Sequence, residues 1–141
     1  MNDLHQRIYE LGRSLQLVHV ATVDERGRPW VRPVVGQLDE QLTLRFSTYL
    51  NSRKVGHIGR QPGVHATLGA TDPRSQRWLQ FDGVAEVSTS AEEREGFWFE
   101  GLRAHIDGVD DPLYGVVLIR PRRIELCSVD QPEAETWTRA A

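Results

Sequence analysis

The sequence has almost no cysteine: Cys127 is the single one in 141 residues. This excludes an intramolecular disulfide and a zinc site built from cysteines. Long apolar runs are also missing, because no stretch approaches the ~20 residues that a membrane-spanning helix needs. The N-terminus likewise has no apolar core of signal-peptide length. These absences predict a cytoplasmic protein that does not contact a membrane.

A strong excess of charge of either sign is missing as well. The chain has 17 lysines and arginines, 20 aspartates and glutamates, and a formal net charge of -3 at pH 7. Its one short basic run, Arg120–Arg123, is typical of a solvated strand end. We therefore expect no nucleic-acid partner. With 39% hydrophobic and 26% charged residues, the chain is predicted to form a single globular domain over residues 1–141.

Common catalytic and metal-binding motifs are absent too. The sequence contains no G-x-S-x-G elbow, no H-E-x-x-H, no P-loop and no G-x-G-x-x-G. The five histidines show no metal-like spacing, and His19 and His65 fit hydrogen-bonded strand residues better than metal ligands. Asp107, Asp110 and Asp111 lack the alternation of an EF-hand and predict a plain turn. We expect no metal site and can name no catalytic acid or base.

What the chain does have is clear helical and strand-like periodicity. Three helices are predicted: from Asn2 or Asp3 to Leu15, from Asn51 or Ser52 to the stop at Gln61–Gly63, and from Ser90, in a capping box with Glu93, to Leu102. Seven segments read as strands: Leu17–Val23, Trp30–Val35, Leu42–Thr48, Val64–Ala70, Arg77–Ser88, Leu113–Ile119 and Arg123–Val129. The tail from Asp130 is expected to fray.

The order of these segments predicts an α+β fold that is mainly β. Strands do not alternate one for one with helices, which argues against a doubly wound parallel sheet. Successive hairpins favour an antiparallel barrel or Greek-key sheet of about six to seven strands with peripheral helices. Pro33 should mark an edge, a bulge or the approach of something other than a strand, and Gly83 should mark a bend or bulge.

One segment, STYLNSRKVGHI at Ser47–Ile58, conflicts with helix electrostatics. Arg53 and Lys54 follow the capping residue, Asn51 or Ser52, and so lie at the positive end of the predicted helix. Solvated cations there cost roughly 0.3–1 kcal/mol each. A bound phosphate would resolve the conflict, because free N–H groups, an arginine fork and a lysine all attract it. The alternative is a solvated cationic turn whose modest cost is tolerated.

Arg32 strengthens the phosphate interpretation. It lies in a predicted strand directly before Pro33, whose backbone cannot donate a ladder hydrogen bond, and two residues after Trp30 on the same face. An arginine in this position is often a solvated face residue. Beside a backbone that cannot pair normally, it can instead point into a site.

The run RPWVRPVVG, followed by LTLRFSTYLNSRKVGHIGRQPGVHATL, resembles the flavin-binding split-barrel family. That family is typified by pyridoxamine 5'-phosphate oxidase and by the smaller general stress proteins. Its members show a strand with an arginine, a strand ending in an aromatic–hydroxyl pair, then S-R-K, a short helix and an N-P turn, for which Gln61–Pro62 stands here. The later segments Phe81–Gly83 and DDPLYGVVLIRPRRIEL resemble the stress-protein branch. The resemblance covers roughly Leu17 to Leu126 and implies a split β-barrel.

The resemblance further implies a homodimer with FMN held in the cleft between subunits. By position, the FMN phosphate would be held by Arg32, Ser52, Arg53 and Lys54. Pro33 and Val34 would offer backbone to the isoalloxazine ring, and Ser47 and Thr48 would line its edge. Trp78 would pack on the flavin, with a buried core tryptophan as the alternative.

Departures from the oxidase branch narrow the function. Gln37 stands where that branch has a lysine, Trp78 replaces a flavin-contacting glutamine, and Ser47 replaces a tyrosine. No histidine follows His105, so the C-terminal R-x-H pair that reads pyridoxine phosphate has no counterpart. We therefore do not expect oxidation of pyridoxamine phosphate.

The implied function is an FMN-dependent oxidoreductase of the general stress branch, with a small-molecule electron donor or acceptor. Two alternatives remain open from the sequence. One is a flavin-binding module without turnover, acting as a buffer or redox sensor. The other is a split barrel that uses a deazaflavin, or haem with His57 or His65 as axial ligand.

Overall fold

The computed structural model describes residues 2–140. The strands in this part of the chain are β1 (Gln16–Val23), β2 (Pro29–Leu38), β3 (Leu44–Tyr49), β4 (Gly63–Leu68), β5 (Arg77–Ser88), β6 (Tyr114–Ser128) and β7 (Gln131–Thr138). The helices are α1 (Asp3–Gly12), α2 (Arg53–Arg60), α3 (Ala91–Gly96) and a short 3-10 helix, η1 (Glu100–Ala104). None of the helices among these residues is both long and apolar enough to cross a membrane.

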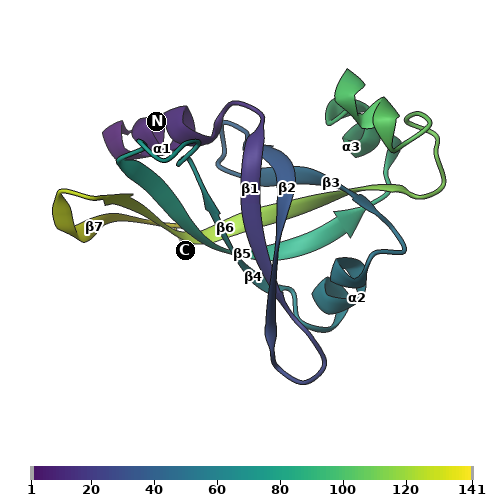
Figure 1. Ribbon diagram of the computed structural model, residues 1–141, viewed down its shortest axis with the longest axis horizontal. Coiled ribbons are helices and arrows are strands. Elements are labelled where there is room, and N and C mark those ends of the chain that lie inside the picture. Colours follow the sequence, from purple (N-terminus) through teal and green to yellow (C-terminus); the bar gives the residue numbers. More distant parts are fainter. Residues whose placement is uncertain (1, 141) are drawn as a thin grey trace.

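The first six strands form a closed antiparallel barrel. Their order is β3-β2-β1-β4-β5-β6, and a further β3–β6 pairing closes the ring. The strands β1 to β3 follow one another as neighbours, and β4 returns to lie beside β1, which is a Greek-key arrangement. The strand β7 extends the sheet beyond β6, and the helices lie at the periphery (Figure 1). The prediction of a mainly-β split barrel with peripheral helices is confirmed.

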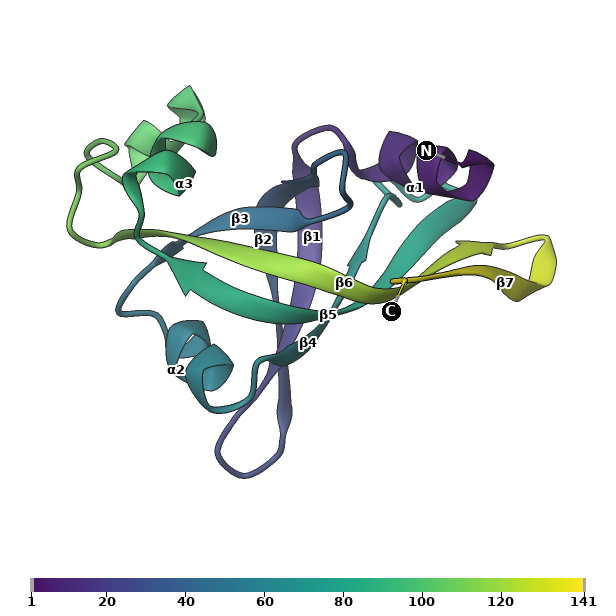
Figure 2. The same cartoon turned by 180° about the vertical axis from the view of Figure 1, so that it is seen from behind.

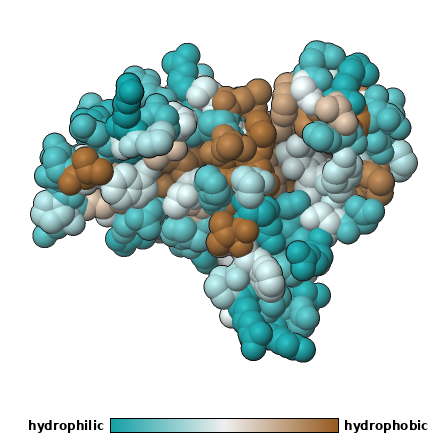
Figure 3. All heavy atoms as spheres, in the orientation of Figure 1, coloured by the Kyte–Doolittle hydropathy of each residue, from teal (hydrophilic) through white to brown (hydrophobic). Residues whose placement is uncertain are grey.

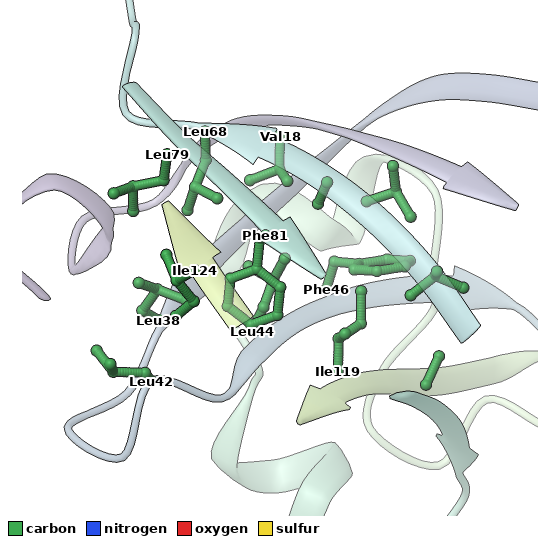
Figure 4. Close-up of a cluster of buried hydrophobic side chains, with 14 of the residues drawn as sticks. Val18, Leu38, Leu42, Leu44, Phe46, Leu68, Leu79, Phe81, Ile119 and Ile124 are labelled. Atoms are coloured by element: carbon green, nitrogen blue, oxygen red, sulfur yellow. The ribbon is translucent and has the colours of Figure 1, made fainter. Parts of the chain in front are cut away.

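Alternating apolar residues fill the barrel. Val18 of β1, Leu44 and Phe46 of β3, and Phe81 of β5 are 0% exposed and point toward one another from three strands (Figure 4). Ile8 of α1 and Ile58 of α2 are buried in the same cluster. In the view from behind, these two helices lie at different ends of the barrel (Figure 2). Each such side chain contributes about 1.5–3 kcal/mol on burial, which makes the barrel interior the main source of stability.

A second apolar cluster attaches the α3–η1 segment to the outside of β6. Phe97, Leu102 and Ile106 are buried against Tyr114, Val116 and Leu118. The Tyr114 hydroxyl donates to the Arg94 carbonyl at 2.9 Å. On the same flank, the Arg45 guanidinium of β3 bonds the Glu93 carboxylate of α3, with Nε–Oε2 at 2.9 Å. This packing holds the segment beside β3.

The helix boundaries differ from the sequence predictions in two places. The first helix ends at Gly12 and not near Leu15. A Cβ at Gly12 would lie 2.4 Å from a Leu38 methyl carbon. The third predicted helix is broken into α3 and η1. Ser90 caps α3 by accepting from the Glu93 backbone N–H at 3.2 Å, but the Glu93 carboxylate binds Arg45, so the predicted capping box is half formed.

Two strand predictions at the C-terminal end were wrong. The segments predicted as separate strands around Arg120–Arg122 form one strand, β6. On its β5 side, Pro121 lies opposite Gly83 at the bulge. On the other side it lies in a gap, because β3 pairs with β6 only as far as Ile119 and β7 only from Arg123 onward. The tail expected to fray is β7, which pairs with β6 and is joined to α1 through two hydrogen bonds between Arg7 and Glu135, at 2.6 and 2.8 Å.

Backbone conformation explains two further details. The third strand begins at Leu44 and not at Leu42, because Leu42 has φ 64, in the left-handed region, while its side chain is buried. Gly83 marks a bulge, as predicted, because the β5–β6 register shifts between Asp82 and Gly83. A Cβ at Gly83 would lie 2.6 Å from the Arg120 carbonyl oxygen, so the close strand approach requires glycine.

Candidate functional site

The strand β2 has a free edge where Pro33 lies. It pairs with β1 from Pro29 to Gly36, whereas β3 pairs with it only from Gly36 to Leu38. On the β3 side, Pro33 and Val34 therefore have no neighbouring strand. The prediction that Pro33 marks an edge is confirmed, and a cleft opens between this edge and β3.

The cleft has a volume of about 320 Å³. Its walls come from β2, the end of β3, the start of α2, and the segment around η1. The lining residues are Pro33, Val34, Val35, Ser47, Thr48, Tyr49, Lys54, Phe99, Gly101, Leu102, His105 and Ile106. The structure thus brings together five of the residues that the sequence predicts, Pro33, Val34, Ser47, Thr48 and Lys54.

Beside the cleft lies a basic cluster of Arg32, Arg53 and Lys54. Burial, and then the positive charge of Arg53, lowers the pKa of Arg32. Burial, and then the charge of Arg32, lowers the pKa of Lys54. Within residues 2–140, none of the three forms an ion pair with a carboxylate. The cluster is therefore a concentration of positive charge that carboxylates of the described chain do not neutralise.

Arg32 is anchored through one nitrogen of its guanidinium. Its Nη1 donates to the Thr22 hydroxyl at 2.7 Å, to the Trp30 carbonyl at 3.0 Å and to the Val20 carbonyl at 3.2 Å. Behind it, the Thr22 hydroxyl also bonds Nδ1 of His57 at 2.8 Å. The remaining guanidinium N–H groups make no hydrogen bond to the described residues. Arg32 is thus held in place while its other guanidinium N–H groups can still donate to a ligand.

Lys54 is held by two hydroxyls of the predicted site. Its Nζ donates to Ser52 Oγ at 2.9 Å and to Thr48 Oγ1 at 3.1 Å. Ser52 occupies the N-cap position of α2, yet its side chain does not accept from a backbone N–H of the helix. The N–H groups that begin α2 are therefore left without this cap, next to two cations.

Arg53 is held by an aromatic ring that the sequence interpretation did not assign to the site. Its guanidinium carbon lies 5.5 Å from the centre of the Trp30 ring. The Trp30 indole donates to Asp24 Oδ2 at 2.8 Å. That bond, followed by the backbone N–H of Arg28, lowers the pKa of Asp24 to about 2. Asp24 thus orients Trp30, and Trp30 stacks on Arg53.

The cover of the cleft was also missed by sequence reasoning. Phe99, Leu102, His105 and Ile106 come from the α3–η1 segment, far along the chain from the other lining residues. The Tyr49 hydroxyl donates to the His105 carbonyl at 2.7 Å and joins this cover to the end of β3. No local motif marks these residues, because their place depends on the packing of η1 against β6.

Trp78 is the one predicted site residue that lies apart from both the cleft and the basic cluster. It is half-buried on the outer face of β5 and lines a separate hollow with Leu17, His19 and Thr67. It is not a core tryptophan either, because its neighbours in β5, Leu79 and Phe81, are the residues that point inward. Within one copy of the chain, Trp78 cannot pack on a ligand in the cleft.

The outer face of β1 and β2 is apolar and exposed. Leu17, Val31 and Val35 are 61%, 63% and 37% exposed, and Leu17 pairs directly with Val35 in the β1–β2 register. Figure 3 shows hydrophobic surface gathered over these two strands. Contiguous apolar surface of this kind commonly marks a protein interface.

A larger hollow, of about 590 Å³, lies on the outer face around Gly63, His65 and Arg122. It is a poorer anion site than the cleft, because Arg122 is paired with Asp82 at 3.1 Å. Residues 2–140 also contain no group of three or more histidine, cysteine, aspartate or glutamate side chains arranged to hold a metal ion. The cleft and its basic cluster are therefore the candidate functional site.

Comparison with known proteins gives consistent results. Residues 4–128 match a family model described as Pyridoxamine 5'-phosphate oxidase. General stress protein 26 of Bacillus subtilis (strain 168) is 26% identical over 130 residues, which cover 92% of this chain and 91% of that protein. The crystal structure of General Stress Protein 26 from Bacillus anthracis str. Sterne superposes with a TM-score of 0.85 at 20% identity, covering 98% and 100% of the two chains.

Structural neighbours of this fold differ in the ligand that their descriptions state. One, from Nostoc punctiforme PCC 73102, is a pyridoxamine 5'-phosphate oxidase-related, FMN binding protein (TM-score 0.66, 17% identity, 96% and 85% of the chains). Another is an F420 reductase (0.65, 23%, 88% and 98%). A third is a heme binding protein from Mycobacterium smegmatis (0.71, 14%, 95% and 56%). At these identities the likeness establishes the fold alone.

Proposed function

Because the chain belongs to the pyridoxamine 5'-phosphate oxidase family, we propose that residues 1–141 form one FMN-binding domain of the general stress protein type. The cleft beside β2 takes the isoalloxazine ring, and the basic cluster takes the phosphate. The observation that carries the proposal is the basic cluster itself. Three cations lie together at the start of α2, and no described carboxylate pairs with any of them.

The donor set suits a phosphate dianion. Arg32 has unused N–H groups, Arg53 adds a second guanidinium, and Lys54 adds an ammonium held by two hydroxyls. Ser52 leaves the first N–H groups of α2 without a side-chain cap. Backbone N–H groups, the helix dipole and an arginine fork all favour a bound phosphate. Burial, and then mutual repulsion, lowers the pKa values of Arg32 and Lys54, and a bound anion would offset both effects.

The cleft suits a flat, largely apolar ring. Val34, Leu102 and Ile106 supply apolar contact, while Ser47 and Thr48 supply hydroxyls at one edge. When bound, FMN would supply electron-transfer chemistry, and the chain would bind and orient it and exclude water. We propose an oxidoreductase that uses a small-molecule electron donor or acceptor. Pyridoxamine phosphate is not proposed as its substrate, because the sequence has no histidine after His105.

We further propose that the protein is a homodimer formed through the apolar face of β1 and β2. Leu17 belongs to that face and also lines the hollow beside Trp78. Association through this face would therefore carry Trp78 into the interface. The partner copy would then bring Trp78 to the flavin, a contact that one copy alone cannot make.

The test is a titration of flavin-free protein with FMN and, in parallel, with riboflavin, which has the same ring and no phosphate. We expect FMN to bind with the larger affinity, to survive desalting with its visible absorption band, and to bind a dimer in light-scattering measurements. Equal affinity for the two flavins would refute the phosphate site. Reduction of the bound flavin by NADH or NADPH would favour an enzyme, and its absence would favour the flavin-binding module without turnover.

The haem alternative receives little support from the histidines that the sequence offered for it. His57 is buried and bonded to Thr22, and His65 lines the outer hollow, away from the cleft. His105 is the histidine that lines the cleft. A Soret band that depends on His105 would favour haem over FMN, and an F420 titration would test the deazaflavin alternative.

A further inference from the structure

A buried polar pair lies directly behind the basic cluster. The Thr22 side chain is 0% exposed and that of His57 is 7% exposed, and Thr22 Oγ1 lies 2.8 Å from His57 Nδ1. The same hydroxyl oxygen accepts the shortest hydrogen bond of the Arg32 guanidinium, at 2.7 Å from Nη1. A continuous chain of hydrogen bonds thus runs from His57 through Thr22 to Arg32.

Counting donors and acceptors gives this chain a direction. Arg32 can only donate, so one lone pair of the Thr22 oxygen is used. The hydroxyl hydrogen then needs an acceptor, and within residues 2–140 the one remaining partner of Thr22 Oγ1 is His57 Nδ1. The hydroxyl therefore donates to Nδ1 of His57, which leaves the ring proton on Nε2. A hydroxyl that donates in this way becomes a better acceptor for Arg32.

We infer that His57 is a positioning residue for phosphate recognition: it fixes the Thr22 hydroxyl so that Arg32 is held with its free N–H groups available to the ligand. The inference rests on the proposed function and assigns to it a residue that does not touch the cleft. The rival explanation is that His57 only fills space beneath α2. The two explanations differ in whether the His57 nitrogen or its bulk matters.

Without an acceptor at His57, the Thr22 hydroxyl hydrogen would be unsatisfied in a site that water does not reach. The hydroxyl would then no longer be fixed with a lone pair directed at Arg32. Arg32 would keep its two carbonyl partners, Val20 and Trp30, but would lose its shortest bond. Affinity for a phosphate should fall, while affinity for the flavin ring should not.

The experiment compares FMN and riboflavin affinities for the full chain and its variants. His57→Leu removes the acceptor and retains bulk, whereas His57→Asn places an amide oxygen near the position of Nδ1. We expect His57→Leu to lower FMN affinity about three- to tenfold, the worth of one hydrogen bond, with riboflavin affinity unchanged. His57→Asn should restore most of the loss. Thr22→Val, which keeps shape and removes the hydroxyl, should match His57→Leu and serves if that variant does not fold.

Three outcomes would overturn the inference. These are unchanged FMN affinity in folded His57→Leu, equal losses for FMN and riboflavin, and failure of His57→Asn to restore what His57→Leu removes. A wild-type protein that binds FMN no better than riboflavin is a different failure. It would refute the proposed phosphate site itself, and the inference would fall with it.

Discussion

Replacing Lys54 by methionine should change cofactor affinity and apo stability in opposite directions. Methionine keeps most of the length of the side chain and removes the charge. The lost contact with phosphate is a charge-assisted hydrogen bond worth about 1.5–3 kcal/mol, so FMN affinity should fall about ten- to a hundredfold. Riboflavin affinity should change little, because the proposed ring contacts lie with other residues of the cleft.

The apo protein should become no less stable, and slightly more so. Lys54 lies at the positive end of α2, and its pKa is lowered by burial and by Arg32. Removing its charge relieves a conflict worth about 0.3–1 kcal/mol, which offsets the loss of its bonds to Thr48 and Ser52. For a domain of this size, Tm should rise by up to about 3 °C. Calorimetry on flavin-free protein measures this.

Arg60→Met is the matched control, because it makes the same charge change in the last turn of the same helix. Arg60 is exposed and bonds Glu25 at 3.3 Å, away from the cleft. A cation is favourable at that end, so the control should lose a few tenths of a kcal/mol of stability and no FMN affinity. The reasoning is refuted if Lys54→Met leaves FMN affinity unchanged, or if both variants lower it equally.

Three further predictions concern the charge of Lys54, the bulge at Gly83 and the ion pairs of Arg45. Because the pKa of Lys54 lies below its usual 10.5, the unfolded chain binds more protons, so apo stability should rise with pH toward that value. FMN affinity should fall over the same range, because the proposed phosphate contact needs the charged lysine. Measurements at about pH 7 and about pH 10 would show whether apo stability rises while FMN affinity falls. Gly83→Ala should lower the free energy of unfolding by about 1–3 kcal/mol in urea, because its Cβ would clash with the Arg120 carbonyl. Gly59→Ala is the control: its Cβ would meet no atom within 4 Å, so it should stabilise α2 by about 0.5–1 kcal/mol. Equal effects of the two substitutions would contradict the close approach of the strands at Gly83. Arg45→Leu strips two half-buried carboxylates of their partner and should cost about 1–3 kcal/mol, and a cost below about 0.5 kcal/mol would show that these ion pairs contribute little.

The barrel was predictable because its strands alternate. Leu44 and Phe46 point inward while Arg45 and Ser47 point outward, and this period of two depends only on neighbouring residues. The errors lie where the neighbouring strands determine whether a residue continues a strand. Pro121 looks like a strand breaker, yet β6 continues through it, because Pro121 lies opposite the β5 bulge at Gly83 and in the gap between the β3 and β7 pairings. The sequence does not contain that information locally, since it depends on which strands end nearby.

The strand β7 was missed because distant contacts, and not its local sequence, decide its conformation. Its residues are mostly polar and exposed, so no alternation of apolar residues indicates a strand. Pairing with β6 and the bonds between Arg7 and Glu135 stabilise it, and both come from distant parts of the chain. Conversely, Pro33 was interpretable because its missing N–H requires a free edge on one side wherever the strand is placed.

The basic cluster was detectable in the sequence because it breaks a local rule. Arg53 and Lys54 oppose the dipole of their own helix, and that conflict is visible without a fold. The cover of the cleft was not detectable, because Phe99, Leu102 and His105 belong to no sequence motif and reach β2 only through the packing of η1. Trp30 falls between the two cases, since its ring was placed on the face of Arg32 but its stacking on Arg53 needs the turn into α2.

These differences suggest how the site divides its tasks. The cations of the basic cluster make contacts of their own, but they also repel one another at the positive end of α2, and the proposed phosphate would offset that repulsion. The residues of the cleft are held by the same apolar packing that stabilises the barrel, and their retention requires no ligand at all. Loss of cofactor should therefore select first against Arg53 and Lys54, while Leu102 and Ile106 persist. A relative of this fold that keeps the apolar cleft but has neutral residues at the start of α2 should be a stable barrel that does not distinguish FMN from riboflavin, and the two titrations would decide it.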